Sequence, residues 1–130
     1  MSSIAILKCR VEDIKHFSKE MRLNNLLPLK KDINYYYFGA YYNNIIIGFT
    51  SIRIYKNKVY FHSSYVKEEF RNKGIFNTLF KFRIDYCIEK GIKIFEGCAT
   101  KRAYSTYVRY GFKETGQEFK FCKKMRLEII

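Results

Sequence analysis

Residues 65–76 have the sequence YVKEEFRNKGIF, the pattern of a strand that ends in a basic turn and continues into an amphipathic helix. Gly74 gives the turn backbone freedom, and Arg71 and Lys73 give it positive charge. A helix N-terminus presents unpaired backbone N–H groups and the positive end of the helix dipole, which together bind phosphate. The segment therefore predicts a site for an anionic cofactor.

A second segment, AYSTYVRYGF at residues 103–112, follows a predicted strand about thirty residues downstream. Together the two segments resemble the GNAT N-acetyltransferase superfamily. Its signature is a strand ending in Val, then [R/Q]-x-x-G-x-[G/A], a helix, a strand and A-x-x-x-Y-x-x-x-G-F. The matching residues are Arg71 and Gly74 in the first half and Ala103, Tyr107, Gly111 and Phe112 in the second. Residues 10–14 (RVEDI) also resemble the start of the first helix in that family, so the resemblance spans nearly the whole chain.

The resemblance implies an α/β (α+β) fold of GNAT type. We expect a mixed central sheet with an antiparallel N-terminal meander, helices on both faces and a parallel strand pair that splays apart. Acetyl-CoA would insert its pantetheine arm into that gap, and its pyrophosphate would lie on the turn. The implied cofactor-binding residues are Ser64, Tyr65, Val66, Arg71, Asn72, Lys73, Gly74, Ile75, Phe76 and Thr100.

Two of these residues depart from the family pattern. Phe76 stands where the family prefers Gly or Ala, so either its ring points away from the pyrophosphate or cofactor binding is weakened. Thr100 stands where many members have an Asn that contacts the cofactor, and its hydroxyl reaches less far.

The resemblance also implies the catalytic side chains. Tyr107 matches the Tyr that protonates the departing thiolate, and a backbone N–H near residues 64–66 would stabilise the oxyanion. His62 lies where many members have a Glu, and an imidazole pKa near 6.5 suits a base. Glu96, within an otherwise apolar strand, is the rival base, and burial would raise its pKa. Since Phe95 holds the place of the Glu found in N-terminal acetylases, Glu96 could face away from the cleft.

The formal net charge is +13, from 25 Lys and Arg against 12 Asp and Glu. A coenzyme does not require such a surplus, so a nucleic acid or an acidic protein stays open as a partner. The charges occur in pairs without a run of five or more, which is not the pattern of a basic tail. The resemblance implies that the acceptor is an amine on a small molecule or protein. An amine carried by nucleic acid, such as aminoacyl-tRNA, and a non-catalytic CoA-binding module are the alternatives.

The length of 130 residues and the apolar content of 48% fit one GNAT-like domain over residues 1–130. No apolar run reaches the roughly 20 residues that cross a bilayer, and no signal-peptide pattern precedes the domain, so we expect a cytoplasmic protein without a membrane partner. The four cysteines form no C-x-x-C pair and have no neighbouring His at zinc spacing, so we expect neither a disulfide nor a metal.

Hydrophobic periodicity and turn residues predict the remaining elements. An edge strand is expected at 3–8, a helix from Glu12 to about Leu23, and an exposed loop after Pro28 that frames the acceptor site. Strands are expected at 35–42, 45–55 and 59–66, and a helix at 75–90 with Ile75, Leu79, Phe82, Tyr86 and Ile88 at helical spacing. A strand is expected at 92–99, a short helix at 101–110 and a final strand at 118–127. The aromatic strand at 35–42 indicates packing on both faces, and it and the final strand could serve a homodimer.

Overall fold

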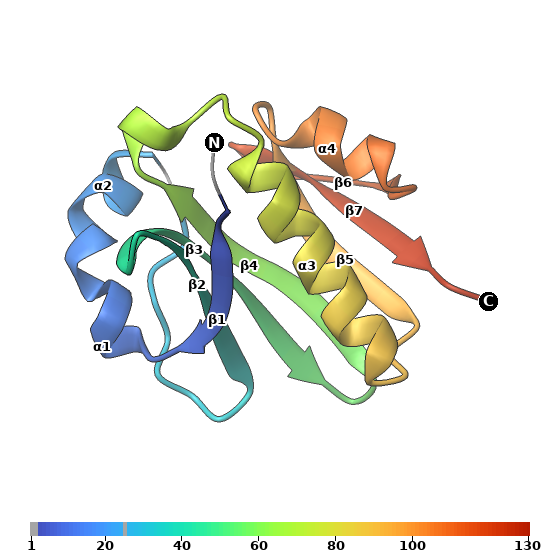
Figure 1. The fold of residues 1–130 in the computed structure, drawn as a ribbon. Coiled ribbons are helices and arrows are strands. Elements are labelled where there is room, and N and C mark those ends of the chain that lie inside the picture. Colours follow the sequence, from blue (N-terminus) through green and yellow to red (C-terminus); the bar gives the residue numbers. More distant parts are fainter. Residues whose placement is uncertain (1–2, 25) are drawn as a thin grey trace.

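The computed structural model describes residues 3–24 and 26–130. These residues form one mixed sheet with the strand order β1-β2-β3-β4-β5-β7-β6, as Figure 1 shows. The strands are β1 (Ala5–Cys9), β2 (Tyr35–Tyr42), β3 (Ile45–Tyr55), β4 (Lys58–Val66), β5 (Ile94–Thr100), β6 (Lys113–Glu118) and β7 (Cys122–Glu128). Only β4 and β5 run parallel, and all the other neighbours are antiparallel. The predicted fold class is confirmed.

The antiparallel meander lies where the sequence predicts it, with β2 and β3 matching to the residue. Asn43-Asn44 and Lys56-Asn57 connect the strands, and all four residues have positive φ. Two successive residues with positive φ form the tight hairpin turn whose twist suits antiparallel strands, and Asn accepts that conformation better than most residues.

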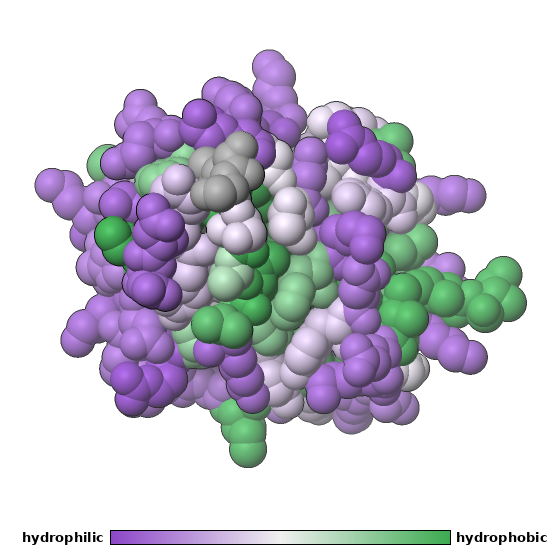
Figure 2. Space-filling model, viewed as in Figure 1, coloured by the Kyte–Doolittle hydropathy of each residue, from purple (hydrophilic) through white to green (hydrophobic). Residues whose placement is uncertain are grey.

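Helices cover both faces of the sheet. On one face lie α1 (Val11–Ile14), the 3-10 turn η1 (Lys15–Phe17) and α2 (Ser18–Leu23); on the other lie α3 (Ile75–Glu89) and α4 (Tyr104–Arg109). Successive side chains of β2 point to opposite faces of the sheet and pack in both layers. Tyr37 packs with Ile14, Phe17 and Met21, whereas Phe38 packs in the cluster beneath α3. Figure 2 shows a pale and apolar zone between β1 and α3, framed by hydrophilic residues.

The parallel pair separates before its strands end. The register joins Lys58 to Ile94 and continues only to Phe61 and Gly97. Residues 62–66 of β4 then pair only with β3, and residues 98–100 of β5 pair only with β7. The backbone groups that these two segments turn toward each other have no strand partner, which leaves a notch whose base is the Phe61–Gly97 pair.

Three predicted elements are corrected. The C-terminal part is a hairpin of β6 and β7 joined at 119–121 rather than a single strand, and the first helix is split by η1. Helix α3 buries Phe80, Arg83, Ile84 and Cys87 along with Ile75 and Leu79, whereas Phe82 and Tyr86 lie half-buried at its side against Phe38. Aromatic and cationic residues alternate over the four positions 80–83, so the sequence alone does not show which of them face the core.

The prediction of no disulfide is wrong, because Cys98 and Cys122 are bonded. In the register of β5 and β7, residue 98 pairs with residue 124 and residue 100 pairs with residue 122. Cys98 and Cys122 are therefore diagonal neighbours across the two strands, although they are 24 residues apart in the sequence. Cys9 and Cys87 are free thiols.

Candidate active site

A β-bulge in β4 shapes one wall of the notch. Thr50 pairs with Ser64 and Ile52 pairs with Phe61, so the single residue Ser51 lies opposite both His62 and Ser63. A bulge of this kind re-aims side chains. As a result two neighbouring side chains contact the same loop: His62 Nε2 lies 3.1 Å from the Pro28 carbonyl oxygen, and Ser63 Oγ donates to the Leu27 carbonyl.

Tyr107 lies at the base of the notch. Its ring is buried and packs edge-to-face on Phe80 and Phe112, with centroids 4.8 and 5.0 Å apart. A Cβ on Gly97 would lie 2.8 Å from Tyr107 Cε1 and closer still to the hydroxyl oxygen. The absence of a side chain at residue 97 therefore lets the phenol reach the point where β4 and β5 part.

The turn that follows β4 leads directly into α3. Asn72 and Gly74 have φ of 61° and 82°, and Gly74 is the N-cap residue, without a side-chain capping bond. The first backbone bond of the helix runs from Thr78 N–H to the Gly74 carbonyl. The N–H groups of residues 75–77 therefore have no acceptor within the helix, and the first turn contains no acidic residue. This end of α3 can accept an anion.

Phe76 leaves this turn open. Its half-buried ring packs against Phe80, one turn further along α3, at 6.0 Å between centroids. A Cβ built on Gly74 would meet no atom within 4 Å, so no side chain covers the backbone there. Asn72, Lys73 and Gly74 are exposed, and Ile75 is buried. The backbone of the turn is therefore exposed.

The other predicted cofactor contacts offer mainly their backbone. Tyr65 and Val66 are buried, and Ser64 Oγ lies 2.6 Å from Thr50 Oγ1. Arg71 Nε donates to the Val66 carbonyl at 2.8 Å, and its guanidinium lies over the Tyr65 ring, so Arg71 fixes the end of β4. Thr100 Oγ1 accepts a bond from the Ala103 N–H at 3.3 Å, which begins the approach to α4.

His62 lies on the sheet face opposite α3, beside the 26–34 loop and edge-on to the Tyr35 ring at 5.0 Å. Burial lowers the pKa of His62, the hydrogen bond to Pro28 opposes this shift, and Lys30, Arg83 and Arg53 lower the pKa further. The net pKa lies below 6.5, so the imidazole is neutral at neutral pH. When Nε2–H donates to Pro28, Nδ1 keeps a lone pair that can accept a proton.

The surroundings of Glu96 do not suit a catalytic base. Its buried carboxylate lies on the sheet face opposite α3, 3.1 Å from Arg126 Nη1, 3.4 Å from Lys58 Nζ and 3.6 Å from Lys124 Nζ. Burial acts to raise its pKa, but Tyr60, Lys124 and Lys58 outweigh burial and hold the pKa below its ordinary value. The prediction of a raised pKa is therefore wrong. Glu96 pairs with Tyr60 before the notch opens, so it lies in the closed part of the strand pair.

The structure thus places Tyr107 at the base of the notch between the free strand edges of 62–66 and 98–100. The turn at 71–76 follows β4 after the 3-10 turn η2 (Glu68–Phe70). The structure separates Glu96 from these elements. The sequence analysis did not predict a role for Arg83, which donates a hydrogen bond from α3 to the Ser51 carbonyl beneath the bulge. The only indication in the sequence is that this charged residue stands next to apolar positions of the helix. Within residues 3–24 and 26–130, no group of three His, Cys, Asp or Glu could hold a metal ion, and no helix is long and apolar enough to cross a membrane.

Comparison with known proteins places this site in a family. The model of the acetyltransferase (GNAT) domain matches residues 7–123. Spermidine N(1)-acetyltransferase of Thermoplasma acidophilum is 28% identical over 114 residues, covering 83% of this chain and 71% of the relative.

Solved structures agree on the fold. The PaiA N-acetyltransferase of Thermoplasma acidophilum in complex with coenzyme A has a TM-score of 0.77 at 19% identity, with 98% of this chain and 99% of that chain covered. The ribosomal-protein-S18-alanine N-acetyltransferase of Escherichia coli has a TM-score of 0.80 at 14% identity, with 98% and 94% covered.

The family model defines the class of protein, an acetyl-CoA-dependent acetyltransferase, and the fold agrees with it. The chain belongs to the GNAT acetyltransferase family, and it is an N-acetyltransferase that uses acetyl-CoA. The acceptor amine is a separate matter, since the relatives named above act on different amines.

Proposed function

We propose that residues 71–76 hold the pyrophosphate of acetyl-CoA and that Tyr107 is the general acid of acetyl transfer to a primary amine, within one domain formed by the whole chain. The observation that carries this proposal is the position of the Tyr107 phenol against Gly97, at the base of the notch. The open turn at the start of α3 follows β4, the strand that forms one side of the notch.

Acetyl-CoA supplies an acetyl group activated as a thioester. The unpaired edge of β4 at residues 64–66 offers backbone N–H groups to the carbonyl oxygen as it gains negative charge. Tyr107 donates the proton of its hydroxyl to the sulfur as the C–S bond breaks. Thr100 and Arg71 hold the ends of the two strands in place.

We propose His62 rather than Glu96 as the base that takes the proton of the acceptor amine. The neutral imidazole and the loop at Pro28 support this role, and the three cations around Glu96 oppose a role for that carboxylate. His62 lies across the sheet from α3, so the amine would approach from the face opposite the helix.

The charge around His62 indicates the acceptor class. All three charged groups that act on His62, namely Lys30, Arg83 and Arg53, are cations. A polycation such as spermidine is repelled there, and an amine on an anionic carrier is attracted. We therefore propose an anionic acceptor molecule.

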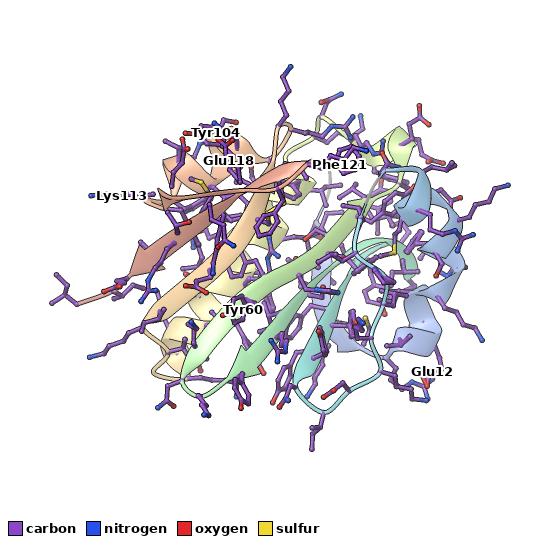
Figure 3. The ribbon with its side chains drawn as sticks, turned by 180° about the vertical axis from the view of Figure 1, so that it is seen from behind. Glu12, Tyr60, Tyr104, Lys113, Glu118 and Phe121 are labelled. Atoms are coloured by element: carbon purple, nitrogen blue, oxygen red, sulfur yellow. A yellow bond between two sulfur atoms is a disulfide. The ribbon has the colours of Figure 1, made fainter. Side chains whose placement is uncertain are left out.

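A nucleic-acid-borne amine is the second candidate, supported by the part of the sheet face opposite α3 that no helix covers. Figure 3 shows Tyr60 on this face, with no helix over it. A basin of about 520 Å³ lies there, lined by Arg53, Tyr55, Lys56, Lys58, Tyr60, Ile94 and Arg126. Four of these seven residues are cations, which suits a phosphate backbone. Two such faces would repel each other, so a homodimer would have to use another surface.

The experiment is a thiol-release assay with acetyl-CoA and a panel of amines. We expect turnover with amines on anionic carriers, weak turnover with spermidine, and a loss of about 100-fold in kcat for Tyr107→Phe with acetyl-CoA binding retained. A Tyr107→Phe variant with parental kcat would refute the acid role. Turnover of spermidine above that of every anionic amine would refute the acceptor class. For nucleic acid, Arg53→Gln with Lys56→Gln should weaken binding of single-stranded RNA and reduce its salt dependence, whereas Arg109→Gln, on α4, should not.

We also propose a cytoplasmic location. Disulfides are rare in the cytosol, so Cys98 and Cys122 would be a dithiol there. Alkylation under denaturing conditions, applied directly to lysed cells, should then label four thiols per chain, and labelling of two would contradict this location.

A further inference from the structure

Helix α3 buries a cation that has no anionic partner. Arg83 is 2% exposed, and no carboxylate of the described residues forms an ion pair with it. Among the described residues its single hydrogen bond runs from Nη1 to the Ser51 carbonyl at a long 3.3 Å, and its Nε has no partner. The guanidinium lies 3.9 Å above the centre of the Phe61 ring and 5.1 Å from that of Phe80.

Stability alone gives no reason for this residue. Burying a charge is costly, and stacking on rings recovers only part of the cost. Replacing a buried charge with an apolar side chain of similar size is often neutral or stabilising. Costly groups of this kind are concentrated at functional sites.

Arg83 shares its surroundings with Tyr107. Both side chains pack on Phe61 and Phe80, and Tyr107 is 6.3 Å from the first ring and 4.8 Å from the second. Phe61 is the last residue of β4 that pairs with β5, and its partner is Gly97, against which the Tyr107 hydroxyl lies. The buried cation therefore lies beneath the base of the notch.

We propose that Arg83 is a positioning residue that stabilises the anionic form of Tyr107 while the phenol transfers its proton to the departing thiolate. This inference rests on the proposed role of Tyr107. In that step the Oη–H bond breaks and an S–H bond forms, and the electron pair of the broken C–S bond stays on sulfur and takes the proton. The phenolate remains in a buried site until it recovers a proton from the acceptor amine or from water. Arg83 is the charge that compensates it.

Acid strength explains why the compensation matters. A free thiol has a pKa of about 8.5 and a free tyrosine about 10, so the phenol is already the weaker acid. Burial raises the pKa of Tyr107 further, and Arg83 acts against that rise. Burial lowers the pKa of Arg83 to about 10, so it stays charged at neutral pH. The other titratable groups that interact with Arg83 are Cys87 on α3, whose pKa burial raises to about 12, and His62 on β4; both are neutral at pH 7.

The test compares Arg83→Met with Arg83→Lys, and uses Lys90→Met, an exposed position just after the same helix, as the control. We expect Arg83→Met to keep or raise the melting temperature, to lower kcat about tenfold, and to leave the KM for acetyl-CoA within about twofold. Arg83→Lys should retain most of kcat. In a Tyr107→Phe background, Arg83→Met should have no further effect on kcat, because the group it assists is gone.

Several outcomes would overturn the proposal. Parental kcat in Arg83→Met, or an equal loss with and without Tyr107, would remove the link between the two residues. An unfolded Arg83→Met would show that the residue serves stability, and loss of kcat in a folded Arg83→Lys equal to that in Arg83→Met would show that charge is not what matters. If the parent protein releases no thiol with any amine, the proposed function fails instead, whatever the Arg83 variants do.

Discussion

Glu96→Gln removes the single carboxylate that three cations share, and its effect separates a structural role from a catalytic one. At an effective dielectric of about 20, a charge pair at roughly 3.5 Å is worth about 5 kcal/mol before desolvation. Burying the carboxylate costs several kcal/mol. The cations are 30–39% exposed, so water screens them and hydrates them once Glu96 is neutral.

We therefore expect Glu96→Gln to lower the free energy of unfolding by about 2 kcal/mol, which is in the range of a charge-assisted hydrogen bond. The melting temperature should fall by roughly 8 °C. The sign of the pH dependence follows from the lowered pKa. Glu96 stabilises the fold above its unfolded value of about 4.5, and that stability is lost as the pH falls through the folded value. The stability of Glu96→Gln should depend less on pH in that acidic window.

The assay is thermal unfolding from pH 3 to 7, together with kcat at a temperature where both proteins are folded. Glu128→Gln is the control, because its exposed side chain also pairs with Arg126, at 2.9 Å, and should cost less than about 0.5 kcal/mol. A Glu96→Gln variant with parental stability and a kcat lowered 100-fold would refute this reasoning and return Glu96 to the role of base.

Three further changes test other parts of the site. Gly97→Ala should lower kcat at least tenfold with the fold retained, because the added Cβ displaces the Tyr107 ring; parental kcat would contradict the packing at the base of the notch. Cys122→Ser, or a reductant, should lower stability by about 3 kcal/mol through the 24-residue loop, as seen by thermal unfolding with and without dithiothreitol; identical curves would oppose a stabilising disulfide. The kcat/KM should fall as the pH drops below His62's pKa, itself below 6.5, and His62→Gln should lose this acidic limb; a limb that persists in the variant would assign it to another group.

The sequence predicted the meander well because its signals are local. Alternating apolar residues and the Asn43-Asn44 turn define two strands without reference to the rest of the chain. The turn at 71–76 was equally local. The strand β6, in contrast, was missed because all six of its residues, KETGQE, are exposed, so it shows no apolar alternation, and Gly116 interrupts its register with β7.

Contacts between distant segments could not be predicted in the same way. The Cys98–Cys122 bond depends on the β5–β7 register, for which the cysteine spacing gives no signal. The pKa of Glu96 depends on cations from β4 and β7 that only the folded sheet brings together. The bulge at His62 and Ser63 likewise breaks the alternation from which side-chain directions are predicted.

Part of the large positive charge of the protein lies around His62. Lys30, Arg53 and Arg83 reach His62 from a loop, from β3 and from α3, and each disfavours an imidazolium. A lower pKa keeps the imidazole able to accept a proton at neutral pH, although it also makes the imidazole a weaker base. The same cations favour an acceptor with negative charge near its amine, since that charge offsets them when the imidazolium forms. An anionic acceptor would thus raise the basicity of His62 on binding, so the acidic limb of kcat should lie at a higher pH with an anionic amine than with a neutral one. If the acidic limb of kcat lies at the same pH with both amines, the charge of the acceptor does not change the basicity of His62.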